Sequence, residues 1–218
     1  MKRNLSLVLA LALSWVAALW AVAVFPERIP AHWNLTGAVD RWGSKYELLT
    51  VPVVQLLLVG LLWVWPRFDP ARRGEWKSWP LLVGITAWGF TLLELGILYL
   101  TRATLAGQPG ELGLRGLWLG IGLFFLVIGN YLPKAPQNWV FGMRTPWTLT
   151  SRRAWAVTNR LAGWVFAVLG VALVLVALFW PGPSVAYAVL GLIGLLLVSA
   201  LYLTWLSYRI WREERRGA

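Results

Sequence analysis

Six long stretches of this chain carry almost no charge, and they limit its fold more than any other feature. A helix needs roughly 20 apolar residues to cross the hydrocarbon core of a bilayer. Six segments reach about that length: residues 5–25, 48–66, 79–100, 113–132, 161–180 and 185–208. Each is continuously apolar and lacks the alternation of a membrane β-barrel strand. The sequence therefore predicts an all-α fold, a polytopic membrane bundle with six transmembrane helices.

The composition also favours a membrane protein over a soluble one. Hydrophobic residues make up 59% of the chain and charged residues only 13%, whereas an average soluble domain carries about 25% charged residues. Lys2 and Arg3 precede the first apolar run, as in a signal peptide. That run is long enough to span the membrane and five more follow it, so we expect the first helix to be retained. The chain has no cysteine, which excludes disulfide and thiol chemistry.

Basic residues are distributed unevenly between the two sets of connections. If the N-terminus is cytoplasmic, the outside holds only Arg28, Arg41, Lys45, Arg102 and Arg115 of the 20 basic residues. The positive-inside rule then predicts that both termini are cytoplasmic, in a multi-pass protein of the cytoplasmic (inner) membrane. The net charge of +11 follows from this asymmetry and from attraction to anionic lipid. The lipid bilayer is therefore an expected partner, and direct binding to nucleic acid is not predicted.

Two connections between the predicted spans are too long and too polar to be simple links. One covers residues 26–47 on the outside, and the other covers residues 133–158 on the inside. By contrast, Pro181, Gly182 and Pro183 form a very short connection, which predicts a tight helical hairpin. We expect the whole chain, residues 1–218, to form a single integral membrane domain in which both long connections are structured.

The outer connection contains the polar stretch IPAHWNLTGAVDRWGSK, which runs from Ile29 to Lys45 and includes the only histidine. Prolines restrict its start, and residues 34–37 and 42–44 each have the composition of a turn. We expect a folded lid on the outer membrane face, lying over the helix bundle. The candidate ligand-binding residues are His32, Asn34, Asp40 and Lys45 in this stretch, together with Glu94 in the third span.

Glu94 is the only acidic residue inside a predicted span. A charge in mid-membrane costs roughly 2.5–3.5 kcal/mol on insertion scales, so such groups usually face a cavity or a partner. A helical rise of about 1.5 Å per residue places Glu94 towards the outer side of the membrane. His32 and Asp40 belong to that side. Two interpretations stay open: a functional pocket residue, or a protonated acid that is hydrogen-bonded between helices.

The same residues also suggest a weaker interpretation, a metal site. Imidazole and carboxylate groups suit zinc or manganese, and the available ligands are His32, Asp40 and Glu94. Such a site is uncommon with one histidine and no cysteine, so neither a metal nor a cofactor is predicted. The polar residues of the outer connection are also suited to hydrogen-bonding its own backbone.

The inner connection combines prolines with basic and hydrogen-bonding side chains. Its prolines prevent a continuous helix, and Thr150 or Ser151 is suited to cap the next helix, which we expect to begin as an interfacial segment. These side chains are equally suited to binding an acidic partner or lipid headgroups and to clamping carbonyls that the prolines leave free. The candidate partner or scaffold residues are Asn130, Pro133, Lys134, Asn138, Arg144, Thr145, Pro146, Trp147 and Arg160.

Both connections resemble signature sequences of the SdpI-type immunity proteins, a family of six-span bacterial membrane proteins. The outer stretch resembles that family's Ile-Pro-x-His-x-Asn-x-x-Gly-x-x-Asp pattern, which is followed by Gly-Ser-Lys. The inner stretch, GNYLPKAPQNWVFGMRTPWTL followed by AWAVTNRLAGW, resembles the second signature, which contains Arg-Thr-Pro-Trp-Thr-Leu. The resemblance covers essentially the whole chain. It implies protection against an exported peptide toxin and, as in the founding case, sequestration of a cytoplasmic transcriptional repressor once toxin is sensed.

Two other functions also fit these residues. One is a small proton-coupled transporter with Glu94 as the carrier residue. The other is a membrane-embedded enzyme that acts on lipid or peptide through His32, Asp40 and Glu94. The sequence has no nucleophile–base motif and no pair of metal ligands at helical spacing. The two polar clusters are also predicted on opposite membrane faces, which suits sensing better than a single reaction centre. The leading prediction is therefore a non-enzymatic immunity protein.

Overall fold

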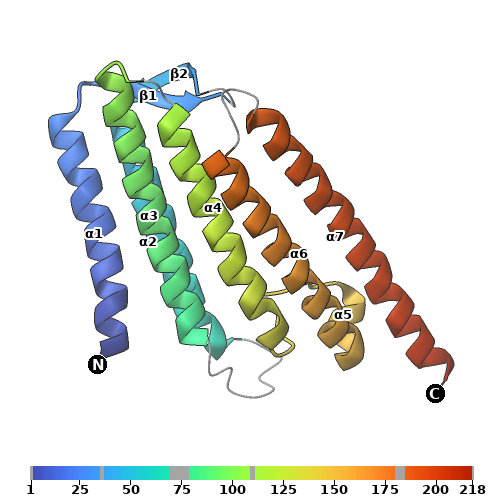
Figure 1. Cartoon of the computed structure of the whole chain (residues 1–218). Helices are drawn as coiled ribbons and strands as arrows, with labels where there is room; N and C mark the ends of the chain where they lie inside the picture. The colour runs from blue at the N-terminus through green and yellow to red at the C-terminus, as the bar shows by residue number, and fades with distance from the viewer. Residues whose placement is uncertain (1, 35–36, 69–78, 109–110, 180–184, 218) are drawn as a thin grey trace. The chain divides into compact units, whose positions relative to one another are not determined.

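The computed structural model describes residues 2–34, 37–68, 79–108, 111–179 and 185–217. These residues form the following elements in chain order (Figure 1): α1 (Lys2–Val24), β1 (Arg28–Trp33), β2 (Val39–Ser44), η1 (Lys45–Leu49), α2 (Thr50–Val64), η2 (Trp65–Arg67), α3 (Trp79–Leu105), α4 (Glu111–Tyr131), η3 (Leu132–Lys134), α5 (Pro146–Thr150), α6 (Arg152–Phe179) and α7 (Val185–Arg216). The elements labelled η are short 3-10 helices.

Within the described residues, six helical segments are long and apolar enough to cross a membrane: Leu5–Val24, Lys45–Arg67, Trp79–Leu105, Arg115–Lys134, Arg152–Phe179 and Tyr187–Arg216. They confirm the predicted all-α polytopic fold. Several helices are longer than predicted, since α3 continues to Leu105 and α7 to Arg216. α6 begins at Arg152. The tight hairpin predicted at Pro181, Gly182 and Pro183 lies outside the described residues.

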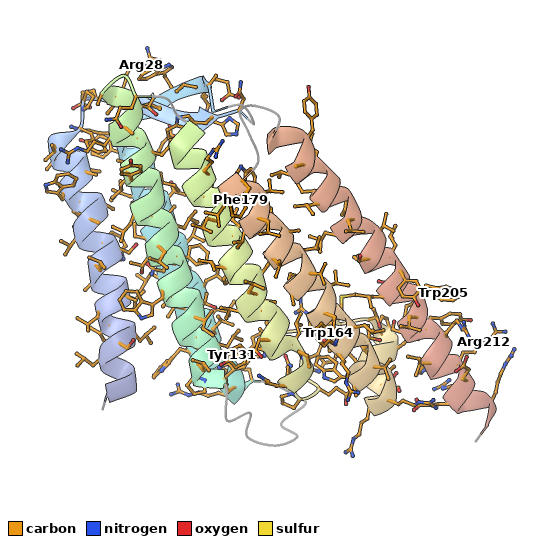
Figure 2. The ribbon with its side chains drawn as sticks, in the orientation of Figure 1. Arg28, Tyr131, Trp164, Phe179, Trp205 and Arg212 are labelled. Atoms are coloured by element: carbon orange, nitrogen blue, oxygen red, sulfur yellow. The ribbon has the colours of Figure 1, made fainter. Side chains whose placement is uncertain are left out.

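Large apolar side chains project outward from these helices, as a lipid-facing surface requires. Trp164 on α6 is 67% exposed and Phe179 at the end of the same helix is 76% exposed. Both are labelled in Figure 2, where many further apolar side chains point away from the ribbon. In water such a surface would be unfavourable by about 25 cal/mol for each Å² of apolar area. The exposed faces therefore fit a multi-pass membrane protein.

The chain divides into two compact units. The first contains Met1–Trp65, Ser78–Gly120 and Ala177–Ala186, and the second contains Pro66–Lys77, Ile121–Val176 and Tyr187–Ala218. The outer connection and Glu94 belong to the first unit, and the inner connection belongs to the second.

In the first unit, α3 packs against both α1 and α2. The buried face of α1 is a stripe of small residues at helical spacing: Ala10, Ser14, Ala18 and Ala21. Small side chains let two helix backbones approach closely. The Thr91 hydroxyl of α3 accordingly donates a hydrogen bond to the carbonyl of Ala10, at 2.9 Å. α1 and α3 are therefore close neighbours in the core of this unit.

The outer connection forms an antiparallel β-hairpin, which the sequence analysis did not predict. Ile29 pairs with Gly43 and Pro30 pairs with Trp42. Ile29 is 1% exposed and packs in an apolar cluster with Phe25 of the segment after α1, Leu48 of η1 and Leu98 of α3. The hairpin thus lies across the ends of α1 and α3 (Figure 1). The contact of Ile29 with these helix residues holds the hairpin on the first unit.

The turn predicted at residues 42–44 is wrong, because these residues belong to strand β2. The glycine at this place serves close packing. A Cβ atom on Gly43 would overlap the carboxylate of Glu47 and would lie 2.8 Å from the Cβ of Ala31. Glycine is therefore required here by the approach of two neighbouring side chains.

In the second unit, α4 and α6 touch through paired glycines. A Cβ atom on Gly163 of α6 would lie 2.7 Å from the carbonyl oxygen of Gly129 on α4. Seven residues away on each helix, a Cβ on Gly170 would lie 2.8 Å from the carbonyl oxygen of Gly122. Two direct backbone contacts along one seam hold these helices at the close distance typical of glycine-mediated membrane packing.

Candidate functional site

The tip of the hairpin is closed by Asn34. Its side-chain Oδ1 accepts a hydrogen bond from the backbone N–H of Ala38, at 3.0 Å. Its own backbone N–H donates to the carbonyl of Ala38, and the N–H of Gly37 donates to the carbonyl of Asn34. Gly37 has a φ of +87°, in the left-handed region that glycine adopts at little cost. The turn predicted here is confirmed at its described ends, while Leu35 and Thr36 lie outside the described residues.

His32 and Asp40 meet on neighbouring strands of the hairpin. The imidazole Nδ1 lies 2.6 Å from the Asp40 carboxylate Oδ1. Both side chains are well exposed, by 63% and 44% respectively. A carboxylate that holds Nδ1 orients the ring and leaves Nε2 as the nitrogen through which a ligand can be bound. The pair is therefore an oriented hydrogen-bonding group on the surface of the first unit.

The base of the hairpin is fixed by Arg41 and Glu47. The guanidinium donates to both carboxylate oxygens of Glu47, at 3.2 and 2.8 Å, and this bonding raises the pKa of Arg41 above its ordinary value. Glu47 also accepts a hydrogen bond from the backbone N–H of Ser44, at 3.2 Å, in a capping box that starts η1. The sequence analysis missed this pair. The Ser44-x-x-Glu47 spacing, which is typical of a capping box, was the available signal.

Two further contacts tie the hairpin to the rest of the first unit. Lys45 forms an ion pair with Glu27, at 2.8 Å, and its side chain is only 14% exposed. The indole N–H of Trp33 donates to the hydroxyl of Thr104 near the end of α3, at 3.2 Å. Lys45 is thus a structural partner within the connection, whereas the His32–Asp40 pair is directed outward.

Glu94 is fully buried in α3 and is not brought alongside His32 and Asp40. Ten residues separate it from Thr104, where the hairpin contacts α3, which corresponds to roughly 15 Å along the helix. Leu98, one turn beyond Glu94, belongs to the apolar cluster of Ile29 and Phe25. An apolar layer therefore lies along α3 between Glu94 and the hairpin. Among the described residues, no group of three or more His, Cys, Asp or Glu could hold a metal ion.

The inner connection of the second unit is organised around Asn138, which is 5% exposed. Its Oδ1 accepts hydrogen bonds from the backbone N–H groups of Val140, at 2.8 Å, and Phe141, at 2.7 Å. Its Nδ2 donates to the carbonyls of Pro136, at 2.7 Å, and Phe141, at 3.0 Å. One side chain thereby satisfies four backbone groups in a segment that has no regular ladder of its own.

The Thr145-Pro146-Trp147 segment begins the short helix α5 and attaches it to α7. Thr145 caps α5 in a capping box with Thr148, and Pro146 occupies the first turn, where its missing N–H costs nothing. The Thr145 hydroxyl also lies 3.0 Å from the hydroxyl of Ser207 on α7. The ring of Trp147 packs edge-on against Tyr208, with 5.2 Å between centroids. These three predicted residues therefore have defined structural contacts.

The remaining predicted residues of the inner connection are exposed: Asn130, Pro133, Lys134, Arg144 and Arg160. Arg144 donates to the carbonyl of Trp139, at 2.7 Å, in agreement with a carbonyl clamp. Lys134 donates to the Oδ1 of Asn130, at 2.8 Å. Pro133 is exposed on one side and faces Gly163 on the other, and Arg160 is exposed on α6. The connection thus presents Arg144, Lys134 and Arg160 on its surface.

Sequence reasoning missed two buried residues of α6 that hold this connection. Asn159 accepts a hydrogen bond from the N–H of Met143, at 2.8 Å, and Trp155 donates from its indole N–H to the carbonyl of Ala135, at 2.9 Å. Gly142, with a φ of +118°, passes directly over Asn159. Ser151 caps α6, as predicted, by accepting from the N–H of Ala154. The four-residue spacing of Trp155 and Asn159 on one helix face was the only signal for their shared role.

Two protein-family models match this chain, one in the region of each polar connection. Residues 134–207, which include the inner connection, match the SdpI/YfhL protein family, and residues 9–56, which include the hairpin, match a domain of unknown function, DUF1648. The chain is 27% identical to the immunity protein SdpI of Bacillus subtilis (strain 168) over 214 residues, which cover 98% of each protein.

A shorter segment of 46 residues is 41% identical to an uncharacterized protein of Archaeoglobus fulgidus and covers 21% of this chain and 25% of that protein. No solved structure gives a significant match. The family match over residues 134–207 and the full-length similarity confirm the resemblance seen in the sequence: the chain is similar to the SdpI/YfhL protein family.

Proposed function

We propose that this protein is a membrane immunity protein, which protects the bacterium that carries it from a peptide toxin arriving from outside. The observation that carries the proposal is the similarity to an immunity protein over 98% of both chains. That similarity extends over the hairpin and the inner connection together, so it concerns the whole architecture. It also favours a non-enzymatic role.

In this proposal the protein lies in the inner membrane with both termini in the cytoplasm. The hairpin binds the toxin on the outer face. Two properties of the hairpin support a receiving role. It offers exposed groups of mixed chemistry, namely the His32–Asp40 pair and Trp42, which is 49% exposed. It is also held rigidly by Arg41, Lys45 and Trp33, so little conformational entropy is lost on binding.

The inner connection serves as the output surface and binds a cytoplasmic transcriptional repressor after toxin is sensed. This role is supported by the exposed basic side chains of the connection and by the buried asparagines that hold its backbone through hydrogen bonds. Arg144, Arg152, Arg153 and Arg160 are exposed, whereas Asn138 and Asn159 are buried beneath them. Arginine on a rigid frame suits an acidic protein surface, because its planar fork loses little freedom when it pairs with carboxylates.

The proposal is tested by challenging sensitive bacterial cells with the toxin of an SdpI-type system. Cells that make this protein are expected to survive, and cells with an empty vector are expected to die. His32→Ala and Asp40→Asn should each lose protection while melting within a few degrees of the parent protein in detergent, because an exposed side-chain pair contributes little to stability. Survival is scored by viable counts.

The matched control is Glu213→Gln on α7, which removes the exposed ion pair between Glu213 and Arg209. It should leave protection intact. Full protection by both hairpin variants would contradict a receiving role for the His32–Asp40 pair. Protection that fell only in step with the amount of folded protein would show that the hairpin is architecture alone.

A further inference from the structure

Five polar side chains in the described part of the first unit are fully buried: Thr101 lies about two helical turns beyond Glu94 on α3, and the other four are spread over three helices. Ser14 lies on α1, Gln55 on α2, and Thr91 and Glu94 on α3, and each of them is 0% exposed. Buried polar groups normally have hydrogen-bond partners, and those that lack one call for an explanation. The immunity proposal gives these four residues no task.

Hydrogen bonds place Gln55 and Thr91 at one level of the helix bundle, next to Ala10 of α1. The amide nitrogen Nε2 of Gln55 donates to the Thr91 hydroxyl at 2.9 Å and to the Ala87 carbonyl at 2.8 Å. Thr91 in turn donates to the carbonyl of Ala10, at 2.9 Å. α1 and α3 run in the same direction, since both lead towards the hairpin (Figure 1).

From that common level, Glu94 is three residues further along α3 and Ser14 is four residues beyond Ala10 on α1. At 1.5 Å per residue these steps are roughly 4.5 and 6 Å in the same direction. The carboxylate and the hydroxyl are therefore at matching heights on neighbouring buried faces. Three helices contribute oxygen atoms within about one helical turn.

Several of these oxygen atoms have no hydrogen-bond partner among the described residues. They are both carboxyl oxygens of Glu94, the Oε1 of Gln55 and the hydroxyl of Ser14. An unpaired buried polar group costs about 1–3 kcal/mol, and a buried charge without a counter-charge costs far more. The unpartnered carboxyl group of Glu94 must therefore be neutralised by something that binds there.

Among the described residues of the helices packed against α3, no buried side chain carries a positive charge. The other described buried residues of these faces carry no charge: Ala10, Ala18 and Ala21 on α1, Pro52, Val59 and Leu62 on α2, and Val83, Ala87, Leu98, Leu100, Thr101 and Ala103 on α3. β1 also packs on α3, but its charged side chains, Arg28 and His32, are exposed. The described residues therefore supply no counter-charge for an ionised Glu94.

We propose that Ser14, Gln55, Thr91 and Glu94 form an intramembrane site for a small monovalent cation, a proton or a sodium ion, which neutralises Glu94. A single carboxylate balances one positive charge, so a divalent ion would leave excess charge in the membrane. The available ligand atoms are all oxygens, which suit hard cations. This site is independent of the proposed immunity function, because it lies beneath the apolar layer and away from the hairpin.

The experiment uses dicyclohexylcarbodiimide, which modifies protonated carboxyl groups in apolar surroundings. The purified full-length protein is labelled in detergent over a range of pH, in sodium chloride or in choline chloride, and the label is located by peptide mass spectrometry. Glu94 should be modified, and the modification should fall as the pH rises and the carboxyl group loses its proton. Exposed Glu213 should not show the same labelling.

The two salts identify the ion. If sodium binds, sodium chloride should reduce the labelling of Glu94 at least tenfold relative to choline chloride. Equal labelling in the two salts assigns the site to a proton. A wild-type protein that stays folded but unlabelled at every pH would overturn the proposal.

Variants test whether the neighbouring oxygens belong to the site. Glu94→Gln should give no label at this position and should still fold, since a neutral amide needs no cation. Ser14→Ala and Gln55→Leu remove one ligand each and should shift the pH midpoint of labelling or weaken the sodium protection. If both leave midpoint and protection unchanged, the four-residue site is wrong, whatever the result with Glu94→Gln.

Discussion

Replacing Gly163 with leucine is expected to prevent the second unit from folding, with the largest effect of any change considered for this chain. A Cβ atom at this position would lie 2.7 Å from the carbonyl oxygen of Gly129 and 2.7 Å from the ring of Pro133. The first neighbour is backbone and the second is a rigid ring, so neither can turn aside. Relief requires α4 and α6 to separate, which also breaks the contact of Gly122 with Gly170.

We expect a loss at or above about 3 kcal/mol, the upper end of the usual cost of overpacking. The measurement is the yield of monodisperse protein after extraction and its melting temperature in detergent. Gly191→Leu on α7 is the matched control, because no heavy atom of the described residues lies within 4 Å of a Cβ placed there. Equal behaviour of the two variants would contradict the glycine-mediated contact between α4 and α6.

Asn138→Leu should be the second most damaging change, through the inner connection. The substitution leaves two buried N–H groups and two carbonyls without the partners that Asn138 supplies. At about 1–3 kcal/mol for each group left unsatisfied, and with some of them regaining water, a loss of roughly 3 kcal/mol or more is expected. The melting temperature should fall, and proteases should cut the segment between η3 and α5 faster.

Asn138→Asp is the graded control, because it keeps the acceptor for the two N–H groups and loses only the donor. Its loss of stability should lie between those of the parent protein and Asn138→Leu. Asn130→Ala, at an exposed neighbouring position whose amide pairs with Lys134, should melt like the parent protein. An Asn138→Leu protein with unchanged melting and protease sensitivity would show that the connection is held by α6 alone.

The membrane spans could be predicted because length and apolarity alone decide them. The hairpin could not be predicted, because packing on the helices overrides the local preference of its residues. Strand β1 contains Pro30 and strand β2 contains Gly43, and these residue types usually indicate turns. The strands pair because Ile29 is buried against Phe25 and Leu98, a contact between residues far apart in the sequence. Propensity is overridden there by packing on the helices.

Only part of the candidate site could be predicted, because the rest depends on how the helices pack. His32, Asp40 and Asn138 lie in motifs that resemblance brings out, and the structure gives each of them defined contacts. Glu94 was predicted as an unusual intramembrane acid, but its neighbours Ser14 and Gln55 were not. Serine and glutamine inside apolar runs carry no signal of which helix face they occupy. Only the packing of α1, α2 and α3 brings them to one level.

The central claim, that an external toxin meets the hairpin, is tested most directly by photo-crosslinking at two matched tryptophans. Trp42 on the hairpin is 49% exposed and Trp139 in the inner connection is 48% exposed. Each is replaced in turn by a photoreactive phenylalanine derivative, and toxin is added to the outside of intact, protected cells. A crosslink from position 42 and none from position 139 is the predicted result. A crosslink from position 139, or none from position 42 in cells that remain protected, would contradict the proposed receiving surface.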